Sequence, residues 1–391
     1  MRILAIETSA DETAVSIVEA DGEFPEATYE LCGNALRSQV ETHTKYGGIF
    51  PMMAKREHAK ALVPLFRLAL EEADLYVEEE QHVEMQTQQQ IEEILEREPD
   101  LASDLTALLQ EVALPEFDLI AVTNGPGLAP ALWVGVNFAK ALSVVTGTPV
   151  VPTNHMEGHV LASIYDIEED DALSALTFPV VALLISGGHT ELVKMSDWDV
   201  YEKIGQTRDD AVGEAFDKVA RMLDLPYPGG PEIERLSNQA RVANLPAFKV
   251  DMPRPMLNSG DLDFSFSGLK TSVLYAIKDK TLSDVDKQAI ARDFSDAVAD
   301  VLLAKSTQAI RQTGAKTLIV GGGVSASQFL RDRFAEYFAH VLPEVTVYFP
   351  HRPLSTDNSI MIALAGHARA ATARTGASVV RIAAESNRSL A

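Results

Sequence analysis

Two histidines four positions apart are the residues of this sequence best suited to hold a metal ion. They are His155 and His159 in the run His-Met-Glu-Gly-His, and residues at this spacing share one face of a helix. A distant aspartate, Asp357, can add a third ligand. Two imidazoles and a carboxylate leave open positions for a substrate oxygen, which suits Lewis-acid chemistry on an acyl or phosphoryl group. The alternative is a capped helix start after Asn154, with both histidines facing water.

Four glycine-rich turns at the ends of expected strands are a second candidate for ligand binding. Without a Cβ in the way, their backbone N–H groups can point at an anion. The turn at 321–325 also precedes an expected helix, whose N-terminus favours a phosphate or nucleotide. Each one can instead be an ordinary tight turn, but four beside a potential metal pair favour a nucleotide cleft. The turns are Asn124-Gly-Pro-Gly127, Ser186-Gly-Gly-His189, Tyr227-Pro-Gly-Gly-Pro231 and Gly321-Gly-Gly-Val-Ser325.

Acidic side chains accompany these turns. Asp11 and Glu12 lie in an expected hairpin turn, and Glu214 and Asp217 share one face of an expected helix that follows Asp209 and Asp210. Carboxylates near a nucleotide can bind ribose hydroxyls, hold a cation or act as a general base. Helix capping and surface charge are the alternative for any one of them.

The pattern of strands and helices predicts a duplicated α/β fold. Strands at 2–8 and 13–19 form one hairpin, and the same design returns where the strand 179–185 runs into Ser186-Gly-Gly-His189. Further single strands are expected at 118–123, 149–153, 316–320 and 344–349. Helical periodicity is found at 55–74, 129–146, 211–223, 267–278, 287–312 and 326–340.

The stretch 76–112 interrupts this plan. It is rich in Glu and Gln, with apolar residues at roughly helical spacing, and it contains Pro99. We interpret it as an inserted helical hairpin, split at the proline, that serves as a docking surface for a partner or as a simple surface extension. A partly disordered acidic loop is the alternative.

Composition limits the class of protein. The 391 residues, 46% of them hydrophobic, are enough for two cores of ordinary size. No apolar run is long enough to span a membrane, and the sequence at Met1 does not resemble an export signal, so a cytoplasmic protein with no membrane partner is expected. Cys32 is the only cysteine, which leaves His and carboxylate as metal ligands. A net charge of −24 argues against unaided binding to nucleic acid.

Nine motifs occur together and in order, and they carry a resemblance. With them, the sequence resembles the TsaD family of tRNA N6-adenosine threonylcarbamoyltransferases, of the actin-like ATPase superfamily. The resemblance runs from Arg2 to about Gly366, apart from the insertion near 76–112. The motifs are Glu7-Thr-Ser-Ala-Asp-Glu-Thr13, Asn124-Gly-Pro-Gly-Leu128, His155-Met-Glu-Gly-His159, Ser186-Gly-Gly-His-Thr190, Gly213-Glu-Ala-Phe-Asp-Lys218, Tyr227-Pro-Gly-Gly-Pro231, Asp263-Phe-Ser-Phe-Ser-Gly-Leu-Lys270, Gly322-Gly-Val-Ser-Ala326 and Thr356-Asp-Asn358.

The resemblance implies a duplicated actin-like, ribonuclease H-like fold with two lobes and a central nucleotide and metal cleft. We expect an N-terminal lobe of residues 1–153 plus 365–391, with the helical insertion at 76–112, and a C-terminal lobe of residues 154–364. The reaction that it implies is transfer of threonylcarbamoyl from threonylcarbamoyl-AMP to N6 of adenosine 37, in tRNAs that read codons starting with A. The products are t6A and AMP.

The resemblance also implies site residues and cofactors. His155, His159 and Asp357 would bind one Fe²⁺ or Zn²⁺, while Asp11 and Glu12 match carboxylates tied to activity. It leaves the binding of ATP or ADP open. The residues that would hold the adenylate are Ile185, Ser186, Gly187, Gly188, His189, Asp217, Gly230, Glu234 and Ser327.

Implied partners are tRNA, the paralogue TsaB and the ATPase TsaE, with TsaC supplying the adenylate. Five positions depart from the family pattern. Ala10 stands where cysteine is usual, Ser327 stands where asparagine is usual, and Ser355 and the Met52-Met53 pair also differ. Of these, the shorter Ser327 side chain puts one nucleotide contact in question.

Three other classes of protein compete with this interpretation. A metalloprotease would need Glu directly after the first histidine, whereas here Glu157 is two residues on. A sugar-type kinase of the same superfamily would explain the glycine turns but not the three metal ligands. A catalytically silent scaffold of the TsaB kind would not need those ligands either.

Overall fold

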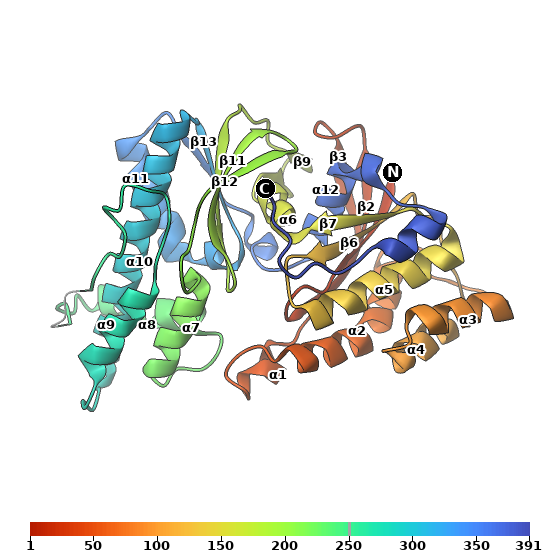
Figure 1. The fold of residues 1–391 in the computed structure, drawn as a ribbon, viewed down its shortest axis with the longest axis horizontal. Helices are drawn as coiled ribbons and strands as arrows, with labels where there is room; N and C mark the ends of the chain where they lie inside the picture. Colours follow the sequence, from red (N-terminus) through yellow and green to blue (C-terminus); the bar gives the residue numbers. More distant parts are fainter. Residues whose placement is uncertain (249–251) are drawn as a thin grey trace. The chain divides into compact units, whose positions relative to one another are not determined.

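The computed structural model describes residues 1–248 and 252–391 (Figure 1). The chain forms two compact units: unit 1 contains Met1–Ser174 and Asp357–Ser389, and unit 2 contains Ala175–Thr356 with Leu390–Ala391. The boundaries differ from the expected residues 153 and 364. Helix α6 (His155–Ala162) packs on β7 and on α12 (Ile360–Ala368), so both helices belong to unit 1.

Unit 1 is built on a seven-stranded sheet. Strand β1 pairs parallel with β6, and β6 with β7, whereas the β1–β2–β3 meander is antiparallel. In sheet order the strands are β7 (Val150–Asn154), β6 (Leu119–Gly125), β1 (Arg2–Glu7), β2 (Glu12–Asp21), β3 (Thr28–Ser38), β9 (Ala172–Leu173) and β8 (Tyr165–Asp166).

Helices cover both faces of this sheet because its strands carry apolar side chains on both sides. Leu4 and Ile6 of β1 belong to the core shared with helices α2 (Pro51–Glu72) and α5 (Ala129–Thr146). Helix α12 contacts β1, β6 and β7, and it also packs against α6 (Figure 1). A short helix, α1 (Val40–Thr44), precedes α2.

The expectation that no apolar run is long enough to span a membrane is wrong for helix α5, which has the necessary length and apolar character, the one such helix in the part of the chain that the structure describes. Its apolar side chains are buried against α2, β6 and β7, and Gly147 ends it in the left-handed conformation. It is therefore a core helix of unit 1.

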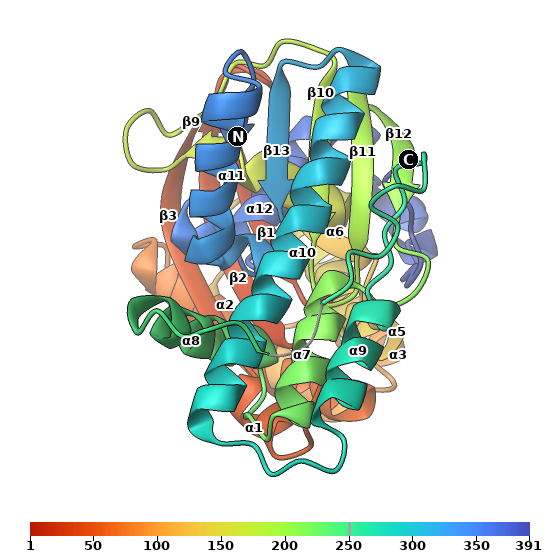
Figure 2. The same cartoon turned by 90° about the vertical axis from the view of Figure 1, so that its left-hand side faces the viewer.

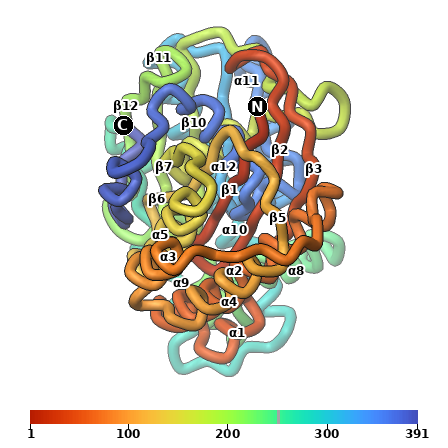
Figure 3. The backbone as a smooth tube through the Cα atoms, turned by 90° about the vertical axis from the view of Figure 1, so that its right-hand side faces the viewer, coloured from red at the N-terminus to blue at the C-terminus, as the bar shows by residue number. Residues whose placement is uncertain are grey.

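The insertion folds as the expected helical hairpin (Figure 3). Helix α3 (Met85–Ile94) and helix α4 (Pro99–Glu111) lie beside α2 and α5, and the two-residue strands β4 (Val77–Glu78) and β5 (Val112–Ala113) pair at its base. Pro99 starts α4, as its fixed φ favours at the first helical position. The apolar faces of both helices join the unit 1 core, which excludes the disordered-loop alternative.

We expect the substitution Leu105→Ala to lower the free energy of unfolding by about 2–5 kcal/mol, because Leu105 is fully buried in this core. Urea denaturation followed by circular dichroism measures it. Met85→Ala, at an exposed position of α3, is the control and should change stability by no more than about 0.5 kcal/mol. Equal effects would mean that the hairpin does not pack as described.

Unit 2 repeats the sheet plan of unit 1. Its strand β10 pairs parallel with β13, and β13 with β14, whereas β10–β11–β12 is antiparallel. In sheet order the strands are β12 (Val200–Gln206), β11 (Thr190–Asp197), β10 (Val180–Ile185), β13 (Thr317–Gly321) and β14 (Thr346–Tyr348).

The thirty-residue helix α10 (Asp284–Thr313) is the central helix of unit 2 and contacts the sheet and its neighbouring helices (Figure 2). A capping box at Ser283 and Asp286 starts it, and Gly314 ends it. The other helices of the unit are α7 (Val212–Met222), α8 (Gly229–Val242), α9 (Ser267–Ile277), the 3₁₀ turn Gly323–Ala326 and α11 (Gln328–Val341).

The predicted duplicated α/β fold is therefore confirmed. Five strands of the unit 1 sheet, β7-β6-β1-β2-β3, have the same order and the same mixture of parallel and antiparallel pairs as the unit 2 sheet, β14-β13-β10-β11-β12. The expected strands and helices are all present to within a few residues. The sequence did not predict β3, β12, α8 or α12. Glycine-rich Tyr227-Pro-Gly-Gly-Pro231 was interpreted as a turn alone, although it also opens α8.

Candidate functional site

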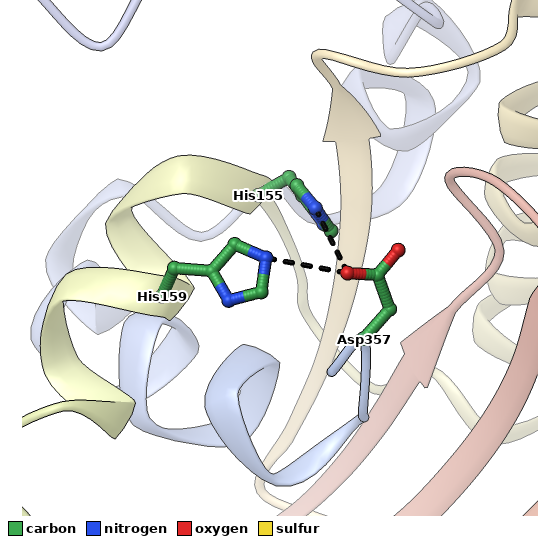
Figure 4. A group of neighbouring side chains, drawn as sticks. All are labelled: His155, His159 and Asp357. Atoms are coloured by element: carbon green, nitrogen blue, oxygen red, sulfur yellow. Dashed lines mark ion pairs between the residues drawn. The ribbon is translucent and has the colours of Figure 1, made fainter. Parts of the chain in front are cut away.

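The three predicted metal ligands converge in unit 1 (Figure 4). His155 Nε2 and His159 Nε2 lie 3.4 Å and 3.2 Å from Oδ1 of Asp357, and one ligand atom from each residue lies within 4.8 Å of the others. The two imidazole rings are nearly perpendicular, at 82°. This set can hold one metal ion with three protein ligands and leave positions open.

Local sequence explains how α6 presents both histidines. Asn154 caps the helix, its side chain accepting hydrogen bonds from the N–H groups of Met156 and Glu157. The capped start expected in the alternative interpretation is thus present, but the histidines do not face water, since His155 is 6% and His159 1% exposed. That alternative is wrong for both side chains.

Glu157 points away from the histidines. Its carboxylate is buried and forms a two-oxygen ion pair with Arg369, at 2.7 Å between Oε1 and the guanidinium. A metalloprotease would need this carboxylate beside the metal as its general base. The structure therefore argues against that class of protein.

The site attracts positive charge. Burial alone would lower the pKa of His155, but the carboxylates of Asp357 and Glu7 raise it well above its usual value. Burial would raise the pKa of Asp357, yet the two histidines hold it well below the usual range. Burial and the neighbouring His155 lower the pKa of His159. Two carboxylates around two imidazoles thus form a buried cluster that stabilises a cation.

One buried atom shows that the residues fit a metal ion. Nε2 of His159 lies 3.2 Å from Oδ1 of Asp357 but makes no hydrogen bond among the described residues, although a buried polar atom normally makes one. A metal bound between His155, His159 and Asp357 would satisfy it, and the donor set suits Zn²⁺ or Fe²⁺.

Glu7 is a residue of this site that sequence reasoning missed. It is fully buried, and its Oε2 lies 3.2 Å from Nδ1 of His155. Its place in the motif Glu7-Thr-Ser-Ala-Asp-Glu-Thr13 was noted, but only Asp11 and Glu12 were singled out. A glutamate at the end of an apolar strand, where burial is expected, was the available signal.

Asp11 and Glu12 form a carboxylate pair at the start of β2. Burial and the negative charges of Asp11 and Asp357 raise the pKa of Glu12 to about 10. Burial, opposed by a hydrogen bond from Glu12, also raises the pKa of Asp11. The two carboxyl groups are hydrogen-bonded to each other, with the protonated Glu12 as the donor and Asp11 as the acceptor.

The predicted adenylate residues gather in unit 2. A Cβ on Gly213 of α7 would meet the Ser186 carbonyl at 2.7 Å, and one on Gly322 would meet the Ile185 carbonyl at 2.5 Å. A Cβ on Gly229 would meet the backbone of Asp217. The end of β10 is therefore in close contact with the end of β13 and the start of α7, and the start of α8 with the middle of α7.

Other glycines of these turns face open space. A Cβ built on Gly187, Gly188, Gly230 or Gly323 meets nothing within 4 Å. Open backbone at strand ends and helix N-termini is the arrangement that accommodates a phosphate.

Side chains around the open glycines make hydrogen bonds within the protein. Ser186 Oγ accepts from the N–H groups of Gly188 and His189, and Asp217 accepts from the N–H of Gly229. Ile185 is buried, so only its backbone can reach a ligand.

Two predicted residues meet at the start of α11. Glu234 accepts from the N–H of Phe329 at 3.0 Å, and Ser327 caps the helix by accepting from the N–H of Leu330. Ser327, which departs from the family pattern, is thus a helix cap in this structure. Glu234 of α8 therefore links that helix to the start of α11, whereas Ser327 satisfies a backbone N–H of α11 itself.

The turn Asn124-Gly-Pro-Gly127 does not offer free N–H groups. The N–H of Gly127 donates to the Ser386 carbonyl, and the N–H of Leu128 donates to the Ser9 carbonyl. Its glycines instead allow close approach, since a Cβ on Gly127 would meet the Ser9 carbonyl at 2.7 Å. The expectation that this turn binds an anion is wrong, because it packs against other backbone.

We expect Gly187→Ala to weaken binding of AMP or ADP by roughly tenfold or more, because the added methyl fills space that the ligand phosphate would use. Isothermal titration calorimetry measures the affinity. The melting temperature should not change, since the methyl contacts nothing in the protein. Gly314→Ala, at a positive-φ helix end far along the chain, is the contrasting control: it should lower stability without affecting nucleotide affinity.

The chain is similar to known proteins along most of its length. The family model described as "TsaD: tRNA N6-adenosine threonylcarbamoyltransferase" matches residues 30–84 and 101–364. The unmatched residues 85–100 cover α3 and the start of α4. Relatives named tRNA N6-adenosine threonylcarbamoyltransferase are found in Aromatoleum aromaticum and Paraburkholderia xenovorans. The first is 38% identical over 96% of this chain and 93% of its own length, and the second 40% identical over 94% and 92%.

Solved structures give weaker similarities. HypF in a phosphate- and nucleotide-bound form has a TM-score of 0.46 and 13% identity, covering 70% of this chain and 41% of its own. Component A of (R)-2-hydroxyglutaryl-CoA dehydratase from Acidaminococcus fermentans has a TM-score of 0.45 and 11% identity, covering 95% and 99%. The family match and the two relatives are sufficient without them: the chain belongs to the TsaD family of tRNA N6-adenosine threonylcarbamoyltransferases and is a transferase.

Proposed function

We propose that this chain transfers the threonylcarbamoyl group from threonylcarbamoyl-AMP to N6 of adenosine 37, in tRNAs that read codons starting with A. The convergence of His155, His159 and Asp357 in one buried cluster carries the proposal. A catalytically silent scaffold would not need such a cluster, and a sugar-type kinase would not use it. Family membership supplies the reaction class.

The balance of the reaction defines what the chain must do. N6 of adenosine attacks the carbamoyl carbon of the mixed anhydride, the bond from that carbon to the phosphate oxygen breaks, and AMP leaves with the electron pair. N6 loses one proton. The donor is already activated, whereas an exocyclic adenine nitrogen is a poor nucleophile, so orientation and removal of the proton are the protein's main tasks.

In this proposal the carboxylate pair handles the proton. Asp11 accepts it from N6, because the hydrogen bond that Glu12 donates lowers the pKa of Asp11 and so favours its ionised form. Glu12 keeps its own proton and holds Asp11 in place through their hydrogen bond.

The open glycines of unit 2 hold the adenylate in this proposal. Gly187, Gly188 and Gly230 supply unobstructed backbone for the phosphate, with Asp217 and Glu234 fixing the surrounding turns. The same backbone suits ATP or ADP, which carry the same phosphate chemistry. His155, His159 and Asp357 would hold one Fe²⁺ or Zn²⁺, which supplies a Lewis acid for donor oxygens when bound.

Reconstitution tests the function. The chain is combined with TsaB, TsaE, threonylcarbamoyl-AMP and unmodified tRNA, and modified adenosine is measured by mass spectrometry. We expect t6A at adenosine 37 only in the complete mixture. Modification of another nucleotide, or none in the complete mixture, would contradict the proposal.

Partners follow from charge in this proposal. With a net charge of −24, the chain alone should bind tRNA weakly, and a basic surface on TsaB should strengthen binding. Electrophoretic mobility of tRNA with the chain, with TsaB and with both measures this. Tight binding by the chain alone would argue against it. We propose the cytoplasm as the location of this reaction and TsaC as the source of the adenylate.

A further inference from the structure

We propose that Glu7 is a positioning residue that fixes the His155 tautomer needed to bind the metal. This inference rests on the metal site of the proposed function and adds a fourth residue to it. Glu7 does not reach the ligand atoms themselves. It acts through the far side of one imidazole ring.

The carboxylate of Glu7 is surrounded by hydrogen-bond donors. Its Oε1 accepts from the N–H of Ser9 at 2.5 Å, and its Oε2 accepts from Oγ1 of Thr123 at 2.5 Å. The same Oε2 lies 3.2 Å from Nδ1 of His155. Because Glu7 is fully buried, these protein groups take the place of water around the carboxylate.

This arrangement decides which ring nitrogen of His155 carries the proton. An ionised carboxylate can only accept, so Nδ1 must donate to Glu7. Nε2, which faces Asp357 at 3.4 Å, is then the nitrogen whose lone pair can bind a metal. Carboxylate partners of this kind orient ligating histidines and make them more basic.

The backbone around Glu7 is held rigidly. Thr8 Oγ1 donates to the Ala131 carbonyl of α5, and a Cβ on Gly135 would meet that same Oγ1 at 2.3 Å. The Ser9 carbonyl accepts from the N–H of Leu128. Glu7 therefore cannot shift to follow a changed partner, and its acceptor atoms stay opposite His155.

The substitution Glu7→Gln should reverse this bond. In one orientation of the glutamine, the amide oxygen faces the N–H of Ser9 and the amide nitrogen faces Thr123 and His155. The Thr123 hydroxyl can accept a hydrogen bond from that nitrogen. Nδ1 of His155 must then also accept one. The His155 proton moves to Nε2, the metal-binding atom. In the opposite orientation the amide nitrogen faces the N–H of Ser9, and two donors then face each other.

Metal affinity is the first readout. Co²⁺ is titrated into the full chain, followed by its visible absorption and by calorimetry, without any transfer assay. We expect Glu7→Gln to bind Co²⁺ about 10–100-fold more weakly than the unsubstituted chain. Equal affinity of the two proteins would overturn the inference and leave the metal site standing. Failure of the unsubstituted chain to bind Co²⁺ would overturn both.

Matched variants separate the tautomer from burial. Glu157→Gln also neutralises a buried carboxylate on the metal helix, but one that faces Arg369, so its Co²⁺ affinity should stay close to that of the unsubstituted chain. Ser9→Ala removes the other group near Nδ1, an oxygen at 3.2 Å, and should have little effect. A loss of affinity in Ser9→Ala as large as in Glu7→Gln would assign the role to Ser9 instead and overturn the inference.

A second measurement needs no variant. In the unsubstituted chain with labelled histidine, nitrogen NMR should show Nδ1 of His155 protonated in the Zn²⁺-bound state, with the metal on Nε2. Metal on Nδ1 would contradict the inference even if Glu7→Gln failed to fold.

Discussion

Replacing His155 with alanine is expected to reduce threonylcarbamoyl transfer by a factor on the order of 1,000 or more, since Lewis-acid stabilisation is worth several kcal/mol. The substitution removes one of three protein ligands and leaves His159 and Asp357 without a complete site. The reconstituted transfer assay gives the rate, and metal analysis of the purified variant gives the occupancy. Both should fall together.

His367→Ala is the matched control for this variant. His367 is also a buried histidine of unit 1, bound to the Tyr29 hydroxyl at 3.0 Å on α12, and it is not a ligand. His367→Ala should lower the melting temperature by about as much as His155→Ala does. Its transfer rate and metal content should stay unchanged. Normal turnover by His155→Ala would refute the metal role of this residue.

The second large effect concerns the carboxylate pair. Asp11→Asn should reduce the rate about 100- to 10,000-fold, because an amide cannot accept the N6 proton. Glu12→Gln should cost far less, since the glutamine amide still donates to Asp11 as the protonated glutamic acid does. Single-turnover kinetics with saturating donor and tRNA measure the two variants separately from binding.

Asp21→Asn tests whether loss of any acid on β2 matters. Asp21 ends the same strand and is exposed, so the transfer rate of Asp21→Asn should match that of the unsubstituted chain. If Glu12→Gln were the more damaging of the pair, the base would be Glu12 and the assignment of Asp11 would be wrong.

The sequence predicted those parts of the fold that depend on local periodicity and turn chemistry. The hairpin of β1 and β2 and its repeat at β10 and β11 were expected because each alternates apolar strands with a polar turn. Strand β3 was not, since its exposed positions such as Arg37 give it little apolar character. Helix α12 was missed because it is apolar on all sides and short, which resembles a strand.

The candidate site divides in the same way. His155 and His159 share a helix, so their spacing alone placed them together, whereas Asp357 was joined to them by type and by the family motif. Nothing local shows that Glu7 contacts a histidine 148 positions later. Nor does local sequence show that the glycines of Asn124-Gly-Pro-Gly127 face backbone, because that depends on Ser9 and Ser386.

The division of unit 1 into two chain segments has a consequence for biosynthesis. Residues up to Ser174 emerge first from the ribosome, then Ala175–Thr356 of unit 2, and Asp357 only after them. The nascent chain thus presents two imidazoles for nearly two hundred residues of translation without their third partner. We therefore expect a metal ion to be bound at all three ligands only after Asp357 has been synthesised.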